Sequence, residues 1–215
     1  MHNNDSYLTS EKEKWREYVY SLLSPESCSL LVDKDNNLQY KWLELVGKDA
    51  ITFEQLLRTQ RISEDKLIGL SYNSQIIEGC KLKYPNIDFH CQDWNRFCNL
   101  YKANDIGVFI FDGFCAAHGN NLEISLANTL KLVNRCRKHI GEVLLVINTD
   151  SGITKRIVSK KKELSPKEIF KESIEKVFKS SRMPLISSKV IDINTMYEYQ
   201  QSKENTTMLS CGIIF

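Results

Sequence analysis

The sequence of 215 residues lacks the apolar run of roughly 18 or more residues that a membrane-spanning helix requires. It also lacks a secretory signal, because residues 1–15 (MHNNDSYLTSEKEKW) are polar and acidic before they become apolar. Its content of 42% hydrophobic and 26% charged residues is ordinary for a globular chain. These features predict a cytoplasmic protein that makes no contact with a membrane.

Cysteine is present but forms no recognisable framework. The seven cysteines are an odd number, none belongs to a CxxC pair, and no Cys/His cluster has zinc-finger spacing. Most lie inside apolar runs, which is typical of small buried side chains in a reducing compartment. The sequence therefore predicts neither a disulfide framework nor a structural metal.

Three nucleotide and hydrolase motifs are also missing. The sequence contains no GxxxxGK[ST], which excludes a P-loop nucleotidase, and no GxSxG, which argues against an α/β-hydrolase. GxGxxG is absent as well, so an enzyme that uses a nicotinamide cofactor is disfavoured.

Charge is nearly balanced overall but unevenly distributed. The formal net charge is +2, yet residues 155–182 hold ten Lys and Arg against four Glu, so this segment carries +6 and the remainder −4. The segment includes Lys160, Lys161 and Lys162. Such a basic patch predicts an anionic partner such as a nucleic acid, and a solvated lysine-rich helix is the alternative.

Strand-like and helix-like segments alternate along most of the chain. A capped helix is expected from Ser10, and either 27–33 (SCSLLVD) or 40–47 (YKWLELVG) is expected to be the first strand. The expected helices that follow are 50–61, 74–85, 94–102 and 121–141, and the expected strands are 66–72, 86–93, 105–114 and 142–150. This alternation favours an α/β fold with a mainly parallel sheet covered on both faces.

The pattern changes after residue 150. Residues 151–185 are expected to form a basic, partly helical insertion, and 188–201 and 205–215 to form an antiparallel hairpin. With a helical segment at 1–27, we expect one domain over 1–215. Its predicted architecture is a three-layer, Rossmann-like sandwich with a seven-stranded, mainly parallel sheet and a C-terminal antiparallel hairpin.

That arrangement resembles the class I S-adenosylmethionine-dependent methyltransferases. The likeness is best over residues 42–115, where "IGLSYNSQIIEGCKLKYPNIDFHCQD" has the order of strand, cofactor turn, helix, strand and Asp that is typical of the family. DIGVFIFDGF resembles the fourth strand with its terminal Asp, and TTMLSCGIIF resembles the closing hairpin. The resemblance implies that S-adenosylmethionine is the cofactor and that the reaction is methyl transfer.

The resemblance also implies where the cofactor binds. Gly47 takes the position of the turn after the first strand, although the usual GxG pattern is missing, and a turn that merely starts a helix is the alternative. Ser71, Tyr72 and Asn73 stand where an acidic residue is expected to bind the ribose. Ser71 or Asn73 can still bond a ribose hydroxyl, but more weakly because neither is charged.

Two Asp positions complete the implied site. Asp93 matches the residue that reads the adenine amino group, and Trp94 is placed to stack on the ring; the alternative is an Asp that caps a helix beside a core Trp. Asp112 is implied to be a catalytic residue and also to lie beside the cofactor. Burying a carboxylate is costly, so one at the end of an apolar strand is expected to emerge at an edge of the sheet. Gly113 then leaves space beside the methyl group.

The remaining candidates lie on the same rim. His118 is a candidate general base or a bystander, and Phe114 and Asn148 are candidate substrate contacts, with Asn148 a turn former in the alternative. Lys160, Lys161 and Lys162 are expected to bind an anionic substrate.

Two functions are consistent with these residues. The leading one is a methyltransferase acting on a nucleic acid or nucleotide, although neither the Asp/Asn-Pro-Pro-aromatic signature nor the Pro-Cys pair of DNA methyltransferases occurs. The alternative is a catalytically inactive protein of the same fold that serves as a nucleic-acid-binding module or partner subunit. The incomplete GxG pattern at the first turn and the missing acidic residue after the second strand are expected in such an inactive protein.

Overall fold

The computed structural model describes residues 10–59, 62–112, 122–150, 166–180, 197–201 and 206–215. The strands are β1 (Lys41–Leu45), β2 (Leu67–Ser71), β3 (Asp88–Cys91), β4 (Ile106–Asp112), β5 (Leu144–Asp150), β6 (Tyr197–Gln201) and β7 (Thr206–Ile214). The helices are α1 (Ser10–Ser21), α2 (Ile51–Thr59), the short 3₁₀ helix η2 (Glu64–Lys66), α3 (Ser74–Lys83), α4 (Trp94–Leu100), α5 (Leu122–Ile140) and α7 (Pro166–Ser180).

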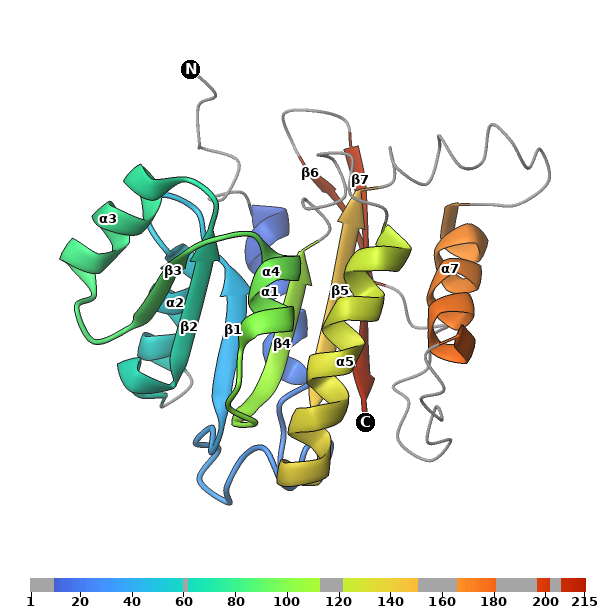
Figure 1. The fold of residues 1–215 in the computed structure, drawn as a ribbon, viewed down its shortest axis with the longest axis horizontal. Coiled ribbons are helices and arrows are strands. Elements are labelled where there is room, and N and C mark those ends of the chain that lie inside the picture. Colours follow the sequence, from blue (N-terminus) through green and yellow to red (C-terminus); the bar gives the residue numbers. More distant parts are fainter. Residues whose placement is uncertain (1–9, 60–61, 113–121, 151–165, 181–196, 202–205) are drawn as a thin grey trace.

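The strands form one sheet in the order β3-β2-β1-β4-β5-β7-β6 (Figure 1). β1 to β5 pair in parallel, whereas β7 is antiparallel to β5 and β6 is antiparallel to β7. The predicted α/β fold, with a mainly parallel sheet and a C-terminal antiparallel pair, is confirmed.

Helices lie on both sides of the sheet. In Figure 1, α4 and α5 lie in front of the strands and α1 lies behind them. Behind the sheet, α1 contacts α2 through the bond from Arg16 Nε to Thr52 Oγ1, 3.3 Å long, and reaches β7 through Trp15, whose Nε1 donates to Ser210 Oγ over 3.0 Å. Contacts of α4 with α5 join the helices in front.

The centre of the core is built by β4 and β5. Every residue from Val108 to Phe111 and from Leu144 to Ile147 is completely buried. Strands that are covered on both faces appear in a sequence as continuous apolar runs, which is why these two were recognisable without a structure.

Of the two candidates for the first strand, 40–47 is correct and 27–33 is wrong. Val32 forms only an isolated bridge with Leu38, and the chain turns sharply between them. The Asp33 carboxylate accepts hydrogen bonds from the amides of Asp35 and Asn37, and Asn36 between them has a φ of 62°. A turn bound in this way ends the apolar run before it can pair as a strand.

α7 lies in the segment expected to be basic. Among its described side chains, Phe170, Ile174, Val177 and Phe178 are buried, and the Phe178 ring lies 5.4 Å from that of Phe215. Within its bounds the helix has four Lys and three Glu, so most of the basic excess of 155–182 falls outside it. Lys160, Lys161 and Lys162 lie outside the described residues.

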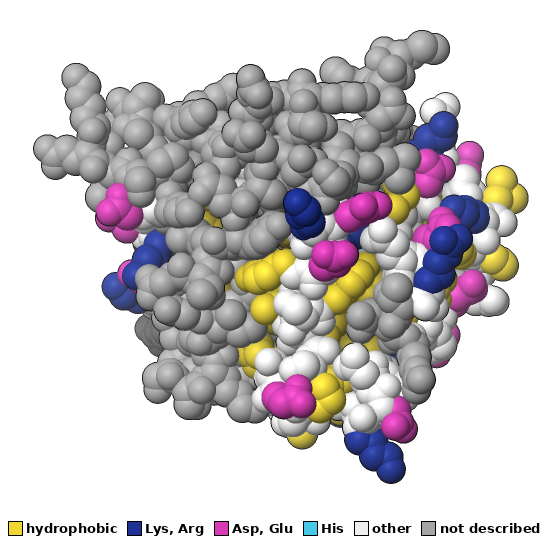
Figure 2. All heavy atoms as spheres, turned by 180° about the vertical axis from the view of Figure 1, so that it is seen from behind, with side chains coloured by type: hydrophobic (Ala, Val, Ile, Leu, Met, Phe, Trp, Pro, Cys, Tyr) yellow, Lys and Arg dark blue, Asp and Glu magenta, His cyan; other side chains and the backbone are white. Residues whose placement is uncertain are grey.

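The described surface shows no concentration of one charge on the face seen from behind. In Figure 2, hydrophobic side chains are visible in the middle of this face, and Lys, Arg, Asp and Glu mix around them. None of the described helices is long and apolar enough to cross a membrane. The six cysteines in the described part of the chain are all free thiols.

A side chain in place of Gly69 on β2 should destabilise the fold. A Cβ at Gly69 would lie 2.5 Å from Cδ1 of the buried Phe89 ring and 3.0 Å from Val46 Cγ1. Gly69→Ala is expected to lower the free energy of unfolding by about 1–3 kcal/mol in urea denaturation. Gly79→Ala on α3 is the control, because a Cβ there meets no atom within 4 Å. That control should stabilise the protein by about 0.5–1 kcal/mol, and equal effects of both changes would contradict the packing argument.

Candidate functional site

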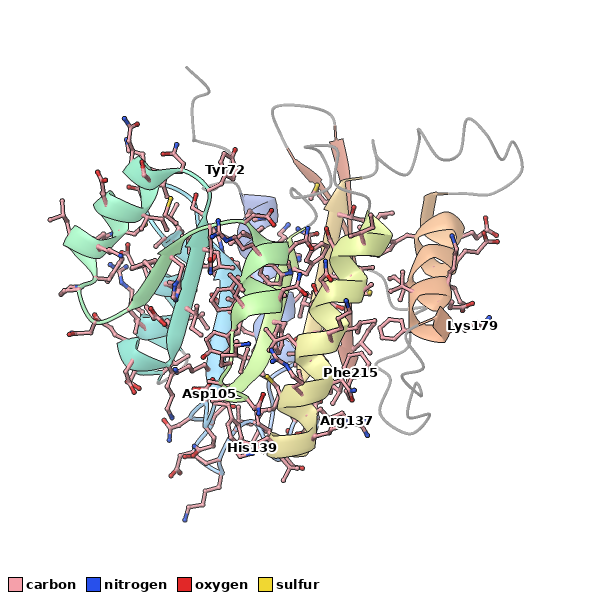
Figure 3. The ribbon with its side chains drawn as sticks, viewed as in Figure 1. Tyr72, Asp105, Arg137, His139, Lys179 and Phe215 are labelled. Atoms are coloured by element: carbon pink, nitrogen blue, oxygen red, sulfur yellow. The ribbon has the colours of Figure 1, made fainter. Side chains whose placement is uncertain are left out.

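The turns that follow the parallel strands emerge at one edge of the sheet. β1, β2, β3 and β4 run in the same direction, so their carboxyl ends lie at the same edge, together with the turns that follow β1, β2 and β3. Gly47, Tyr72 and Asp93 lie in the turns after β1, β2 and β3, and Asp112 is the last residue of β4. Figure 3 shows Tyr72 at this edge, and Asp105 and His139 at the opposite one. The sequence predicted that these candidates share one edge of the sheet, and they do.

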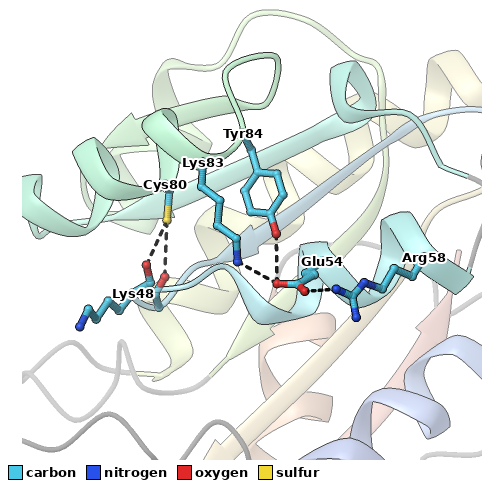
Figure 4. Close-up of polar contacts among 7 residues, drawn as sticks. Lys48, Glu54, Arg58, Cys80, Lys83 and Tyr84 are labelled. Atoms are coloured by element: carbon cyan, nitrogen blue, oxygen red, sulfur yellow. Dashed lines mark hydrogen bonds and ion pairs between the residues drawn. The ribbon is translucent and has the colours of Figure 1, made fainter.

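The first turn, residues 46–50, is held by hydrogen bonds along its length. The Val46 amide donates to Leu70 O over 2.8 Å, and the Ala50 amide donates to Gly47 O over 3.2 Å. From α3, the Cys80 thiol donates to Gly47 O and Lys48 O at 3.6 and 3.7 Å (Figure 4). This turn therefore has a fixed shape.

Ala50 carries the conformation that usually requires glycine. Its φ is 47°, in the left-handed region that side chains with a Cβ seldom adopt, and it is buried. Gly47 is not among the positive-φ glycines of the described chain. The role predicted for Gly47 stays a prediction, and the left-handed position at Ala50 was not predicted, because an alanine gives no signal for it.

α2 and α3, which flank this turn, are joined by a second set of bonds. Glu54 on α2 accepts from Lys83 Nζ over 2.8 Å and from Tyr84 Oη over 3.2 Å, and it also pairs with Arg58 (Figure 4). These contacts fix the distance between the helices that begin after β1 and after β2.

The second turn has no carboxylate, as the sequence indicated. Ser71 Oγ accepts from the Asn73 amide over 3.2 Å, and Asn73 Oδ1 caps α3 by accepting from the Gln75 amide over 2.9 Å. Both polar side chains therefore support the local backbone. Tyr72, which is 69% exposed, projects most fully from this turn.

The third turn agrees with the alternative interpretation of Asp93 and Trp94, an Asp that caps a helix beside a core Trp. Asp93 caps α4, because its Oδ1 accepts from the amides of Asn95 and Arg96 at 2.9 and 3.2 Å. Trp94 is completely buried, and its Nε1 donates to Thr129 Oγ1 over 2.8 Å. The predicted stacking of Trp94 on an adenine ring is therefore wrong, since the ring packs in the core. Asp93 itself is exposed at the edge.

The fourth strand ends beside β5. Asp112 is the last residue of β4 and is paired with Asn148, which in turn is paired with Ser210 on β7. Asn148 is fully buried within a strand, so the alternative of a turn former is wrong for this residue. Gly113, Phe114 and His118 lie outside the described residues.

Glu44 is a further charged residue near this edge, and the sequence analysis missed it. It lies on β1, two residues before the first turn, and is 6% exposed. Trp42 Nε1 donates to Glu44 Oε2 over 3.0 Å. Burial raises the pKa of Glu44 to about 7, although hydrogen bonds from Trp42 and Thr52 and the charges of Lys12 and Arg16 oppose the rise. In the sequence, the only sign of this buried acid was its position inside the otherwise largely apolar strand KWLEL.

Comparison with known proteins identifies the fold. No family model matches the chain, and no curated protein matches its sequence. Solved structures do match. The plantazolicin methyltransferase BamL, in complex with a triazolic desmethylPZN analog and SAH, is 14% identical with a TM-score of 0.52, covering 97% of this chain and 92% of that one.

Two further structures agree. The N-methyltransferase NodS from Bradyrhizobium japonicum WM9, in complex with S-adenosyl-L-homocysteine, is 9% identical with a TM-score of 0.50, covering 99% of this chain and 93% of that one. The CurJ carbon methyltransferase is 10% identical with a TM-score of 0.53, covering 97% of this chain and 57% of that one. The chain thus has the class I S-adenosylmethionine-dependent methyltransferase fold, as its resemblance predicted.

The buried Glu44 predicts an unusual dependence of stability on pH. In the unfolded chain the carboxyl loses its proton near the ordinary pKa of 4.5, whereas the folded protein keeps it until about pH 7. The contribution of Glu44 to the free energy of unfolding should therefore fall by roughly 3 kcal/mol as the pH rises through this window. Urea denaturation from pH 5 to pH 8 should show that Glu44→Gln removes this fall.

Glu54→Gln is the matched control for this measurement. The pKa of Glu54 is lowered, chiefly by its hydrogen bond from Lys83. The contribution of Glu54 to the free energy of unfolding is therefore lost as the pH falls, in contrast to that of Glu44. Identical pH profiles for wild type and the Glu44 variant would contradict the prediction.

Proposed function

We propose that this protein binds S-adenosylmethionine at the carboxyl edge of its sheet and transfers the methyl group to an acceptor. The proposal rests on one combined observation. The class I fold occurs together with a fixed first turn that uses a left-handed backbone at Ala50, on the same edge as an exposed Asp93. A turn that fixes a non-glycine residue in that conformation is typical of a functional site.

Each turn has a part in the proposed site. The backbone of Gly47 approaches the methionine end of the cofactor, and Ser71, Tyr72 and Asn73 supply neutral contacts for the ribose. Asp93 uses Oδ1 to cap α4, and its second carboxylate oxygen serves to accept from the adenine amino group. Trp94 supports this position from the core.

Asp112, Gly113 and His118 are proposed to act on the acceptor. When bound, S-adenosylmethionine supplies an electrophilic methyl group. The chain contributes mainly orientation: Asp112, which ends β4 beside the cofactor turn, holds the nucleophile in line, and Asp112 or His118 takes its proton. Gly113 leaves room for the approach.

For the acceptor we propose an anionic molecule, a nucleic acid or nucleotide, bound through Phe114 and the lysines 160–162, whereas the fully buried Asn148 is not available for such a contact. The supporting observation is the charge of +6 on residues 155–182. Binding of this kind should weaken steeply as salt is added. The free thiols of the described chain support a reducing, cytoplasmic location.

The cofactor is tested by calorimetry with S-adenosylhomocysteine. Wild type should release heat and gain thermal stability, and Asp93→Ser should bind about tenfold or more weakly, because Ser retains the cap but not the second oxygen. The melting temperature of the variant checks that the cap survives. If wild type shows neither heat nor stabilisation at millimolar ligand, the proposal fails, and the inactive alternative, a binding module or partner subunit, takes its place.

A carboxylate at the end of β2 should strengthen cofactor binding. Ser71→Asp keeps an acceptor for the Asn73 amide and adds charge-assisted bonds to the ribose hydroxyls. Titration calorimetry should show S-adenosylhomocysteine binding about tenfold more tightly than in wild type. Ser74→Asp, on the exposed first turn of α3, controls for added charge alone. An unchanged or weaker affinity of the Ser71 variant would show that the ribose does not lie at this turn.

A further inference from the structure

The helix that follows the third turn is held to α5 by a network of side-chain hydrogen bonds. α4 and α5 lie next to each other in front of the sheet (Figure 1). Trp94 Nε1 donates to Thr129 Oγ1 over 2.8 Å, and Thr129 Oγ1 donates to Ser125 O over 2.8 Å. Asn95 Nδ2 donates to Ser125 Oγ over 3.1 Å, and Asn95 Oδ1 accepts from Asn128 Nδ2 over 3.3 Å. We call these five residues the Asn95 network.

The network uses one face of α5. Ser125, Asn128 and Thr129 are three and four residues apart, a spacing that places side chains next to one another on a helix. Ser125 and Thr129 are completely buried, and Asn95 is partly buried. Each of these polar side chains has a partner. A buried polar network that is paired in this way holds the elements that it joins in one arrangement.

Asn95 makes bonds in two directions. Its backbone amide donates to Asp93 Oδ1 over 2.9 Å, and its side chain donates to Ser125 Oγ on α5. The Asp93 carboxylate is therefore connected to α5 through a single residue. The amide of Arg96, 3.2 Å from the same carboxylate oxygen, belongs to the same helical turn. A displacement of this turn would thus move both donors that hold Asp93 Oδ1.

α4 depends on such an attachment because it is short. Its seven residues make about two turns, and a helix of that length is not stable on its own. Its buried Trp94, Phe97 and Cys98 belong to the core, but the hydrophobic effect has no preferred direction. Hydrogen bonds are directional, so the bonds of Asn95 fix the orientation of the first turn more closely than apolar packing does.

We infer that Asn95 and Ser125 are positioning residues for the adenine of the cofactor. They hold the first turn of α4 against α5 and thereby set the orientation of the Asp93 carboxylate, which is proposed to accept from the adenine amino group. The inference rests on the proposed function. α5 then takes part in the recognition of adenine without touching it, and the network affects the choice between adenine and a base that lacks the amino group.

The test compares two ligands that differ only in the base. S-adenosylhomocysteine carries the amino group, whereas S-inosylhomocysteine carries in its place an oxygen that cannot donate to Asp93. A site built to bond a ligand N–H rejects the analogue that lacks it. Titration calorimetry should therefore show that wild type prefers S-adenosylhomocysteine by about tenfold or more.

Asn95→Leu and Ser125→Ala should each lower this preference about three- to tenfold, because both break the bond between the two side chains. Ser125→Ala leaves the carbonyl that accepts from Thr129. The double variant should show about the same preference as Asn95→Leu, since the two changes remove one shared contact. If Asn95→Leu does not fold, Ser125→Ala still decides the matter, because alanine is the residue that helix interiors tolerate best.

Arg135→Met is the matched control, because it breaks a bond between the same two helices at the other end of α4. Arg135 on α5 donates over 2.6 Å to the carbonyl of Tyr101, the C-cap residue of α4. This change should lower the melting temperature without changing the preference for adenine. A general loosening of α4 would weaken the binding of both ligands equally, so the ratio of the two affinities identifies the positioning role.

The outcomes separate the inference from the proposed function. If wild type binds neither ligand, the proposed function fails and the inference fails with it. If wild type binds both ligands equally well, the positioning role is overturned, while binding of the cofactor stands. The same holds if the Asn95 and Ser125 variants keep the preference that Arg135→Met shows.

Discussion

The pairing of β1 with two neighbours is the constraint on which the rest of the structure depends. Glu44 on β1 is in register with Gly69 on β2 on one side and with Ile110 on β4 on the other. From this strand the chain extends first toward β3 and then returns to continue toward β5. In parallel sheets, ligands generally bind beside the carboxyl ends of the two strands at which the strand order reverses, which here are β1 and β4. The 46–50 turn follows β1 at this point. The candidates share this edge because the strands that precede them are parallel.

The same strand carries a buried acid, Glu44, whose ionisation is unfavourable. A carboxylate enclosed by Trp42, Thr52 and the cations of α1 gains hydrogen bonds and charge attraction, but burial outweighs them, as its raised pKa shows. An apolar residue there would pack without that cost.

Much of the fold was predictable because it depends on local patterns. The apolar runs of β4 and β5, the long amphipathic α5 and the C-terminal hairpin are each recognisable in a window of a few residues. The position of Asp93 before a helix was recognisable as well. The two candidate first strands were not distinguishable, because the turn made by Asp33 depends on the hydrogen bonds it forms once folded.

The site was less predictable because its decisive features are not local. Trp94 was assigned to a ligand because sequence does not reveal that Thr129, 35 positions away, accepts its indole proton. Glu44 gave little signal because the groups that surround it come from a helix that precedes β1 and from the start of α2. The conformation of Ala50 is imposed by its neighbours, whereas the residue type alone would favour another.

The bond from Trp15 to Ser210 has a consequence for how the protein is made. The two residues are 195 positions apart, so α1 cannot reach this partner until β7 has been synthesised and paired. Contacts between such distant parts of a chain form late, since a large loop must close before they can be gained. On the ribosome, the Trp15 indole would therefore lack this partner until β7 has been synthesised, a period in which chaperones and proteases have access to the chain.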